Sequence, residues 1–164
     1  MTRAVWFALF CAFASPVLAQ DDAEGAKDHT MAAMARDVEF SMTELAAALH
    51  AKGSVALHNV LFDTGKATLK LESAAALVPV GDLLRTNRSL KLEIQGHTDN
   101  DGNPALNLKL SQERAAAVKA HLVQTYGIAP DRLTTCGFGD TRPIAENATD
   151  AGRAQNRRVQ LVKK

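Results

Sequence analysis

The sequence has few cysteines and no excess of charge of either sign. Its 164 residues contain two cysteines, and 19 Lys and Arg stand against 18 Asp and Glu, a formal net charge of +1. This balance argues against binding to nucleic acid or another polyanion through a basic surface. Cys11 lies in the apolar N-terminal run, so its removal would leave Cys136 without an internal disulfide partner. Its neighbours "LTTCGF" are typical of a strand, which favours a buried, inert thiol.

Long apolar runs are also scarce, and the N-terminus holds the clearest one. "MTRAVWFALFCAFASPVLAQ" carries Arg3, then an uncharged apolar run, then small residues ending at Ala19. This layout predicts a secretory signal peptide over 1–19, too short to span a bilayer. Phe10 before Cys11 argues against a lipoprotein site. Removing 19 of 164 residues leaves 145, with as many acidic as basic residues, so we expect an exported, soluble chain with no transmembrane segment.

The segment after the signal peptide lacks a periodic apolar face. Residues 20–36 are small, polar and Ala-rich, which predicts a flexible leader. Residues 37–53 do show apolar residues at helical spacing, which predicts an amphipathic helical segment that ends at Gly53. The apolar residues at helical spacing there are Val38, Met42, Leu45 and Leu49.

Strand-like and helix-like segments alternate through the rest of the chain. Alternating apolar residues predict strands over about 54–62, 89–97, 131–139 and 157–162, and helical spacing predicts helices over about 73–86, 106–126 and 150–154. Helices of this length between strands predict crossover units and a sheet with substantial parallel pairing, covered by helices on one or both faces. No internal repeat is found.

Several residues mark where these helices begin, bend or end. Ser73 and Thr149 are placed to cap the first and last of them. Gly127 is placed to end the middle one. Pro79 predicts a kink, or a helix whose regular part begins near it, because proline removes a backbone donor.

The stretch "GHTDNDGN", residues 96–103, follows the second predicted strand. Asn, Asp and Gly are common in turns, so turn geometry accounts for most of these residues. The position of Asp99 favours a further role. It lies at the carboxyl end of a predicted strand and near a helix N-terminus, where open α/β sheets bind their ligands.

A polar stripe on the following helix supplies a second group. Asn107, Ser111 and Arg114 fall at i, i+4 and i+7, beside an expected apolar face of Leu108, Ala115, Val118 and Leu122. Arg114 is open to two interpretations. It could form a structural ion pair with Asp99 or lie on the surface with a buried stem, or the two charges could hold the ammonium and carboxylate of an amino acid.

Metal binding and hydrolysis have less support. His97 and Asp99 lack the further ligands of a zinc site, and "DNDGN" is not followed by the distal glutamate of a calcium loop. No G-x-S-x-G elbow is present, Ser111 has no evident base, and no pair of carboxylates suggests a glycosidase. His97 is expected to be structural, and we expect neither a catalytic residue nor a cofactor.

The region from "VLFDTGKATLKLES" through "NRRVQLV" resembles the OmpA-like C-terminal domain, the peptidoglycan-binding module of Gram-negative envelopes. The resemblance covers roughly 54–162 and is carried by "HTD", "N-x-x-LS-x-x-RA", "G-x-G" and "N-x-T-x-x-GRA-x-NRRV". It implies an α/β (α+β) fold, a βαβαβ(α)β two-layer sandwich with a mixed sheet over 54–164. Pro79 and Gly81 depart from the helix formers expected in the first crossover helix.

The resemblance also implies a ligand. The family binds the meso-diaminopimelate residue of the peptidoglycan stem peptide, without covalent attachment or catalysis. Its paired aspartate and arginine correspond to Asp99 and Arg114. Supporting positions are expected at Asp63, Thr64, Gly65, Thr98 and Asn107, and Arg157 and Arg158 of "NRRV" would either support the site or act as structural charges.

The expected function is therefore tethering or organising the cell envelope from the periplasm, in association with the wall or the outer membrane. The alternative is an adaptor that recruits an outer-membrane or other envelope protein through its N-terminal helix. For that helix, simple packing on the domain is an equally good interpretation.

Overall fold

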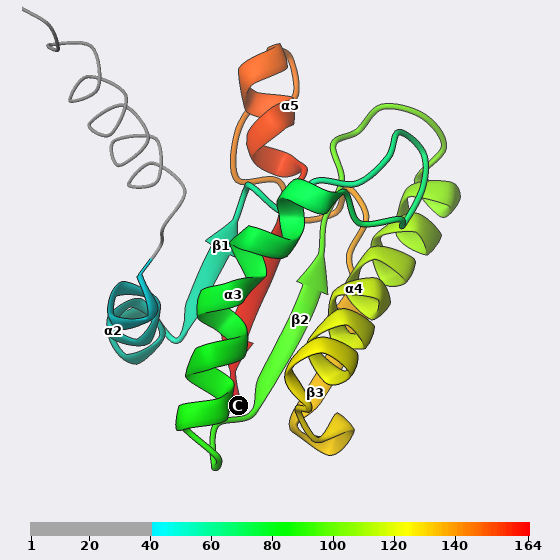
Figure 1. Ribbon diagram of the computed structural model, residues 1–164. Coiled ribbons are helices and arrows are strands. Elements are labelled where there is room, and N and C mark those ends of the chain that lie inside the picture. The colour runs from blue at the N-terminus through cyan, green and yellow to red at the C-terminus, as the bar shows by residue number, and fades with distance from the viewer. Residues whose placement is uncertain (1–40) are drawn as a thin grey trace, which may run out of the picture.

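The computed structural model describes residues 41–164. The expected signal peptide, leader and Val38 lie outside this range. In chain order the elements are α2 (Met42–Lys52), β1 (Ser54–Leu57), α3 (Leu71–Thr86), β2 (Leu92–Gly96), α4 (Pro104–Tyr126), a 3₁₀ turn η1 (Pro130–Arg132), β3 (Leu133–Gly137), α5 (Asp150–Asn156) and β4 (Val159–Lys163) (Figure 1).

The four strands form one mixed sheet in the order β1-β4-β2-β3. β4 runs antiparallel to both of its neighbours, and only β2 and β3 pair in parallel. The expectation of substantial parallel pairing was therefore wrong in part. The crossovers do make β1, β2 and β3 run in one direction, but the last strand inserts between β1 and β2 and separates them.

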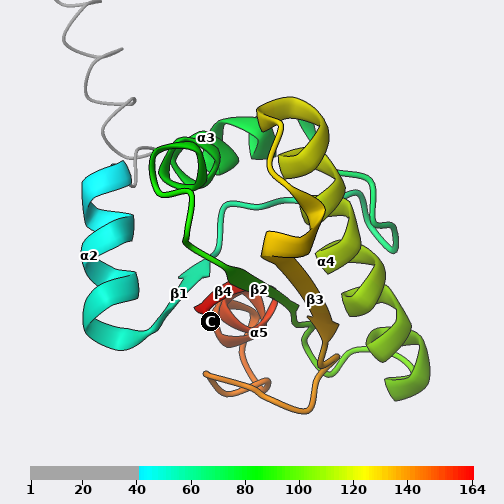
Figure 2. The ribbon, with the colours of Figure 1, turned by 90° about the horizontal axis from the view of Figure 1, so that it is seen from below.

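Helices α3 and α4 lie on one face of the sheet, α2 lies beside α3 at the β1 edge, and α5 lies beyond the ends of the strands (Figures 1 and 2). The result is two layers with the core between them. The sheet side chains in that core alternate with half-buried residues along β1 and β4, as expected for strands with one covered face. The strand residues of the core are Val55, Leu57, Leu92, Ile94, Leu133, Val159 and Leu161.

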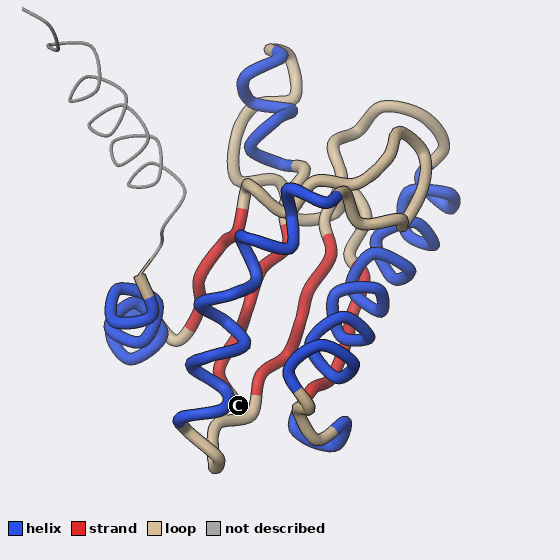
Figure 3. Tube along the Cα trace, in the orientation of Figure 1, coloured by secondary structure: helices blue, strands red, loops and turns tan. Residues whose placement is uncertain are grey.

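The strands are shorter than the alternation predicted, and pairing explains why. β1 ends at Leu57 because its partner there, Val159, is the first residue of β4. The residues that follow therefore leave the sheet in a long loop (Figure 3), which contains an isolated bridge between Phe62 and Leu69. Similarly, residues 130–132 form a 3₁₀ turn before β3 begins.

Helix α2 is a packing helix. Ser41 caps it through a capping box with Glu44, and Gly53 ends it with φ of 69°. Leu45 and Leu49 are buried in the common core. Burial of these two residues favours the packing interpretation over a free recruiting helix.

Helix α3 begins at Leu71, eight residues before Pro79, so the expectation of a regular part starting near Pro79 was wrong. Ser73 does not cap it, because Lys70 holds the cap position without a side-chain bond. Instead the Ser73 hydroxyl accepts from the Leu61 N–H at 2.7 Å and donates to the Leu61 C=O at 2.6 Å.

Gly81 permits the close approach of α3 and α4. A Cβ atom at this position would lie 2.3 Å from the ring of Tyr126, near the end of α4. Close packing against Tyr126 therefore explains why glycine stands at position 81, where a helix former was expected.

We predict that Ser73→Ala destabilises the fold by about 1–3 kcal/mol, because it leaves the Leu61 N–H without its partner and removes one of the two hydrogen bonds that the Leu61 C=O accepts. Urea unfolding of the variant, with the exposed Ser89→Ala as control, measures this. An unfolding free energy equal to that of the control would contradict a structural role for Ser73.

Candidate functional site

The candidate site lies at one end of the sheet, where β1 and β2 end and β4 begins. Because β4 is antiparallel to both neighbours, its first residue pairs with the last residues of both. Three segments distant in sequence therefore meet there: the loop after β1, the loop after β2 and the junction between α5 and β4 (Figure 1).

The loop after β2 is held against α4 by Asn107. Its side-chain amide donates to the carbonyl oxygens of Asp99 at 3.3 Å and Asp101 at 2.9 Å. Asn103 caps the helix, accepting from the backbone N–H of Ala105 at 2.8 Å. Asn107 was expected to support the ligand; in this structure its side chain fixes the backbone on which Asp99 stands.

Close packing of α4 on the sheet explains the rest of the polar stripe. A Cβ atom at Gly96 would lie 2.1 Å from the Ser111 carbonyl oxygen, so only glycine fits. The buried Ser111 hydroxyl accepts from the N–H of Gly139 at 2.9 Å. Leu108 was wrongly placed on the apolar face, since it is 42% exposed, whereas Ala115, Val118 and Leu122 are buried as predicted.

Asp99 is a buried carboxylate with an arginine partner. It is 8% exposed, and its Oδ2 accepts from Arg157 Nη1 at 2.6 Å. Arg157 is the first of the two residues between α5 and β4, and its side chain is 48% exposed. The structural pair that Asp99 forms is thus with Arg157 and not with Arg114.

Arg114 is half-buried and faces the loop after β1. Its Nε donates to the Lys66 carbonyl oxygen at 3.1 Å, and its guanidinium lies 5.0 Å from the centre of the Phe62 ring. Burial lowers the pKa of Arg114, the Asp99 carboxylate raises it and the charge of Arg157 lowers it. Arg114 therefore interacts electrostatically with both members of the Asp99–Arg157 pair.

A pocket of about 210 Å³ lies beside these groups. It is lined by three arginines, Arg114, Arg157 and Arg158, and by His58 and His97. The remaining lining residues are apolar or glycine: Val60, Leu61, Phe62, Gly96, Ala154 and Val159. Among the described residues no Asp or Glu lines it, and Asp99 contacts the lining through Arg157.

Comparison with known proteins shows the family of this chain. The model of the OmpA family matches residues 61–157. Outer membrane porin F of Pseudomonas fluorescens is 45% identical over 102 residues, 62% of this chain and 31% of that protein. The chain thus matches about a third of that relative's length.

Two solved structures have a similar fold. The cell wall anchor of the T6SS from Pseudomonas aeruginosa superposes with a TM-score of 0.58 at 32% identity, covering 73% of this chain and 94% of that one. The peptidoglycan-associated lipoprotein from Burkholderia pseudomallei gives a TM-score of 0.57 at 32% identity, covering 70% and 92%.

The chain belongs to the OmpA family. The predicted α/β class and mixed sheet are confirmed by the fold of these OmpA-family relatives. The relatives are named as a porin, a wall anchor and a peptidoglycan-associated lipoprotein, which supports the prediction of a binding protein and not an enzyme.

The other predicted positions of this OmpA-family chain lie around the pocket and not in its lining. The Asp63 N–H donates to the Thr68 carbonyl at 3.1 Å in the turn that also contains the exposed Thr64 and Gly65. Thr98 is buried, and its N–H donates to Gly139 O at 2.9 Å. The turn contributes to the site through the Lys66 carbonyl, which accepts the hydrogen bond from Arg114.

Sequence reasoning missed the aromatic and backbone partners of Arg114. Phe62 and Lys66 carry no signal for this role, because one sits in an alternating apolar pattern and the other contributes only its carbonyl. Cys136 was expected to be buried, but it is half-buried. Among residues 41–164 there is no cluster suited to a metal ion, and no helix long and apolar enough to cross a membrane.

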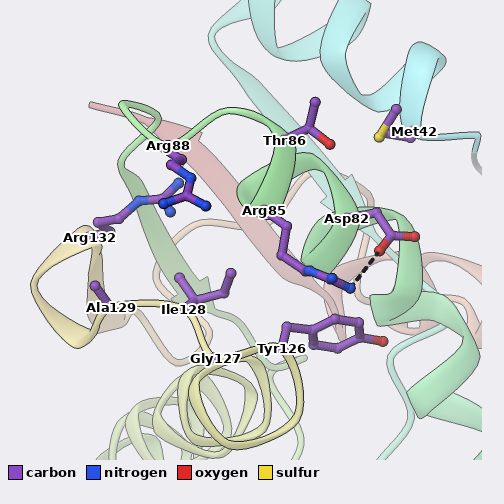
Figure 4. Close-up of a pocket in the computed structure, with 10 residues that line it drawn as sticks. All are labelled: Met42, Asp82, Arg85, Thr86, Arg88, Tyr126, Gly127, Ile128, Ala129 and Arg132. Atoms are coloured by element: carbon purple, nitrogen blue, oxygen red, sulfur yellow. Dashed lines mark ion pairs between the residues drawn. The ribbon is translucent and has the colours of Figure 1, made fainter.

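A larger pocket of about 900 Å³ lies at the opposite end of the sheet, where α3 ends and β3 begins (Figure 4). Its arginines are mostly engaged. Arg85 pairs with Asp82 at 4.0 Å, and Arg132 donates to the carbonyls of Leu84, Asn87 and Leu90 at 2.7–3.0 Å. Arg132 thus closes the carboxyl end of α3 and serves the fold.

His97 is a structural histidine, as predicted. It is 2% exposed and stacks on Phe138 with 5.4 Å between ring centres, and neither ring nitrogen has a partner among the described residues. Burial, together with the smaller effects of the charges of Arg158 and Arg142, lowers the pKa of His97 to about 4.

We predict that His97 makes the fold less stable in acid. Its pKa is about 4 when folded and about 6.5 when unfolded, so the unfolded state binds the proton more readily and stability falls as pH drops from 6.5 toward 4. In His97→Phe, which keeps a stacking ring, the unfolding free energy should fall less across this range. Equal slopes in urea titrations of wild type and variant would contradict the assignment.

Proposed function

We propose that this chain binds peptidoglycan non-covalently through the meso-diaminopimelate residue of the stem peptide and thereby tethers or organises the cell envelope. Two structural relatives are named as a cell wall anchor and a peptidoglycan-associated lipoprotein, which supports a wall ligand. The diaminopimelate part rests on the chemistry of the site. The free end of that residue carries an ammonium beside a carboxylate, the two charges that Asp99 and Arg114 would complement.

The observation that carries the proposal is the state of Arg114. Its half-buried guanidinium lines the pocket, yet in the described part of the chain no carboxylate lies within ion-pair distance of it. Its Nε donates to the Lys66 carbonyl and its guanidinium lies over the Phe62 ring, so the side chain is oriented before a ligand binds. A ligand carboxylate can then take its remaining N–H donors at low entropic cost.

Asp99 would receive the ammonium. Its carboxylate already accepts from Arg157 through Oδ2 and from the Asp101 N–H through Oδ1 at 3.3 Å, but a carboxylate has about four acceptor positions. The ammonium can therefore bind beside Arg157, whose guanidinium keeps Asp99 from being buried as an unpaired charge before the ligand binds.

The surrounding residues would support this geometry indirectly. Asn107 fixes the Asp99 backbone, and the turn with Asp63, Thr64 and Gly65 fixes Lys66. Thr98 lies beside Asp99 in the same loop. Export to the periplasm, which the N-terminal sequence predicts, would bring the chain to the wall.

The adaptor role for the N-terminal helix gains no specific support. Leu45 and Leu49 of α2 are core residues, so the part of the apolar face that they form is already covered, whereas Met42 is 39% exposed. Deleting α2 would expose that core and could not separate lost recruitment from lost stability.

We predict that Asp99→Asn and Arg114→Gln each weaken binding to purified sacculi at least about tenfold, because each leaves one charge of the ligand without its partner. Co-sedimentation of the purified chain with sacculi measures bound and free protein. Asp82→Asn and Arg85→Gln, which remove a similar but exposed pair at the other end of the sheet, are matched controls.

Both control variants should bind as wild type does. Wild-type binding in either site variant would overturn the assignment of that residue. Free meso-diaminopimelate should also release the chain from sacculi, and failure of high concentrations to do so would count against this residue as the ligand.

A further inference from the structure

In the part of the chain that the structure describes, Arg158 is a buried charge without an acidic partner. It is 5% exposed, and its guanidinium donates to three neutral oxygens at the long end of hydrogen bonding: Asn156 O at 3.4 Å, Arg142 O at 3.2 Å and Gln160 Oε1 at 3.3 Å. Its Nε has no partner among the described residues. Because buried charges are normally paired, this arginine requires an explanation.

The pocket as a whole also has more positive than negative charges. Arg114, Arg157 and Arg158 line it, and within residues 41–164 the one carboxylate that pairs with any of them is Asp99, with Arg157. Burial and the charge of Arg158 lower the pKa values of His58 and His97, so both rings are neutral near pH 7 and leave the three guanidiniums as the charges of the lining. The site thus carries two positive charges beyond the Asp99–Arg157 pair.

A zwitterion does not change this balance. Its ammonium and carboxylate cancel each other, so the two excess charges stay uncompensated after it binds. A ligand with one more carboxylate than ammonium groups would neutralise one of them inside a pocket from which water is partly excluded, where the interaction is strong.

We propose that Arg158, assisted by Arg157, selects ligands that bring a second carboxylate close to the zwitterionic end. This inference rests on the proposed function and adds to it a ligand class, a stem peptide in which a residue next to diaminopimelate keeps its carboxylate free. Arg114 takes the carboxylate of diaminopimelate itself, and the Arg158 side of the pocket takes the second one.

Two synthetic tripeptides test this by calorimetry on the full wild-type protein. Both carry N-acetylated alanine, γ-linked glutamate and a meso-diaminopimelate that is amidated at its peptide-linked centre, and the α-carboxylate of the glutamate is free in one and amidated in the other. We expect amidation to weaken binding about tenfold, the loss of one partly buried charge interaction.

Variants assign the effect to residues. In Arg158→Gln the ratio of the two affinities should fall toward one, and Arg157→Gln should give a smaller fall. Arg157 is half-exposed, so its variant keeps the test informative if Arg158→Gln fails to fold. An unchanged ratio in every folded variant would overturn the role of these arginines.

The outcomes separate this inference from the proposed function. If wild type binds both peptides equally and Asp99→Asn binds neither, the proposed function stands and selection for a second carboxylate is wrong. If wild type does not bind the free-carboxylate peptide, or Asp99→Asn binds it as well as wild type, the proposed function is wrong and this inference falls with it.

Discussion

The ion pair between Arg157 and Asp99 joins two parts of the chain that are 58 residues apart in sequence. One part is the loop after β2 and the other is the junction between α5 and β4, which become neighbours only because β4 inserts beside β2. The pair compensates the charge of Asp99, which is otherwise buried at 8% exposure. It also places Arg157 in the wall of the pocket, so the position of the acidic group and the shape of the pocket are set by the same contact.

Local sequence signals predicted the elements better than their arrangement. Gly53 and Gly127 end their helices with φ of 69° and 66°, and Thr149 caps α5, as their residue types suggest. The order of strands has no such local signal, because the insertion of β4 depends on which edges remain free after β1 to β3 are formed. The family resemblance supplied the mixed sheet. The lengths of β1 and β3 could not be read from alternation, since a strand ends where its partner ends.

In the site too, the sequence predicted individual residues better than the contacts between them. Motif positions predicted Asp99 and Arg114 as site residues, and both lie at the same end of the sheet. The partner of each was less predictable. Arg157 was expected only as a supporting or structural charge, and nothing in the sequence shows that it reaches Asp99. Arg114 is oriented by a ring and a carbonyl from the loop after β1, contacts that depend on tertiary structure alone. Helical spacing likewise placed Asn107 beside the site. It gave no sign that the side-chain amide donates to the backbone carbonyls of Asp99 and Asp101.

The central claim is that Asp99, Arg114 and Arg157 form one receptor for a wall amino acid. The most direct measurement is an NMR titration of the full chain with meso-diaminopimelate, following the side-chain Nε–H signals of the arginines. Saturable shifts of the Arg114 and Arg157 signals at one common affinity are predicted, with Arg132 at the opposite end of the sheet unchanged. Unshifted Arg114 and Arg157 signals, or shifts of equal size at Arg132, would contradict the account.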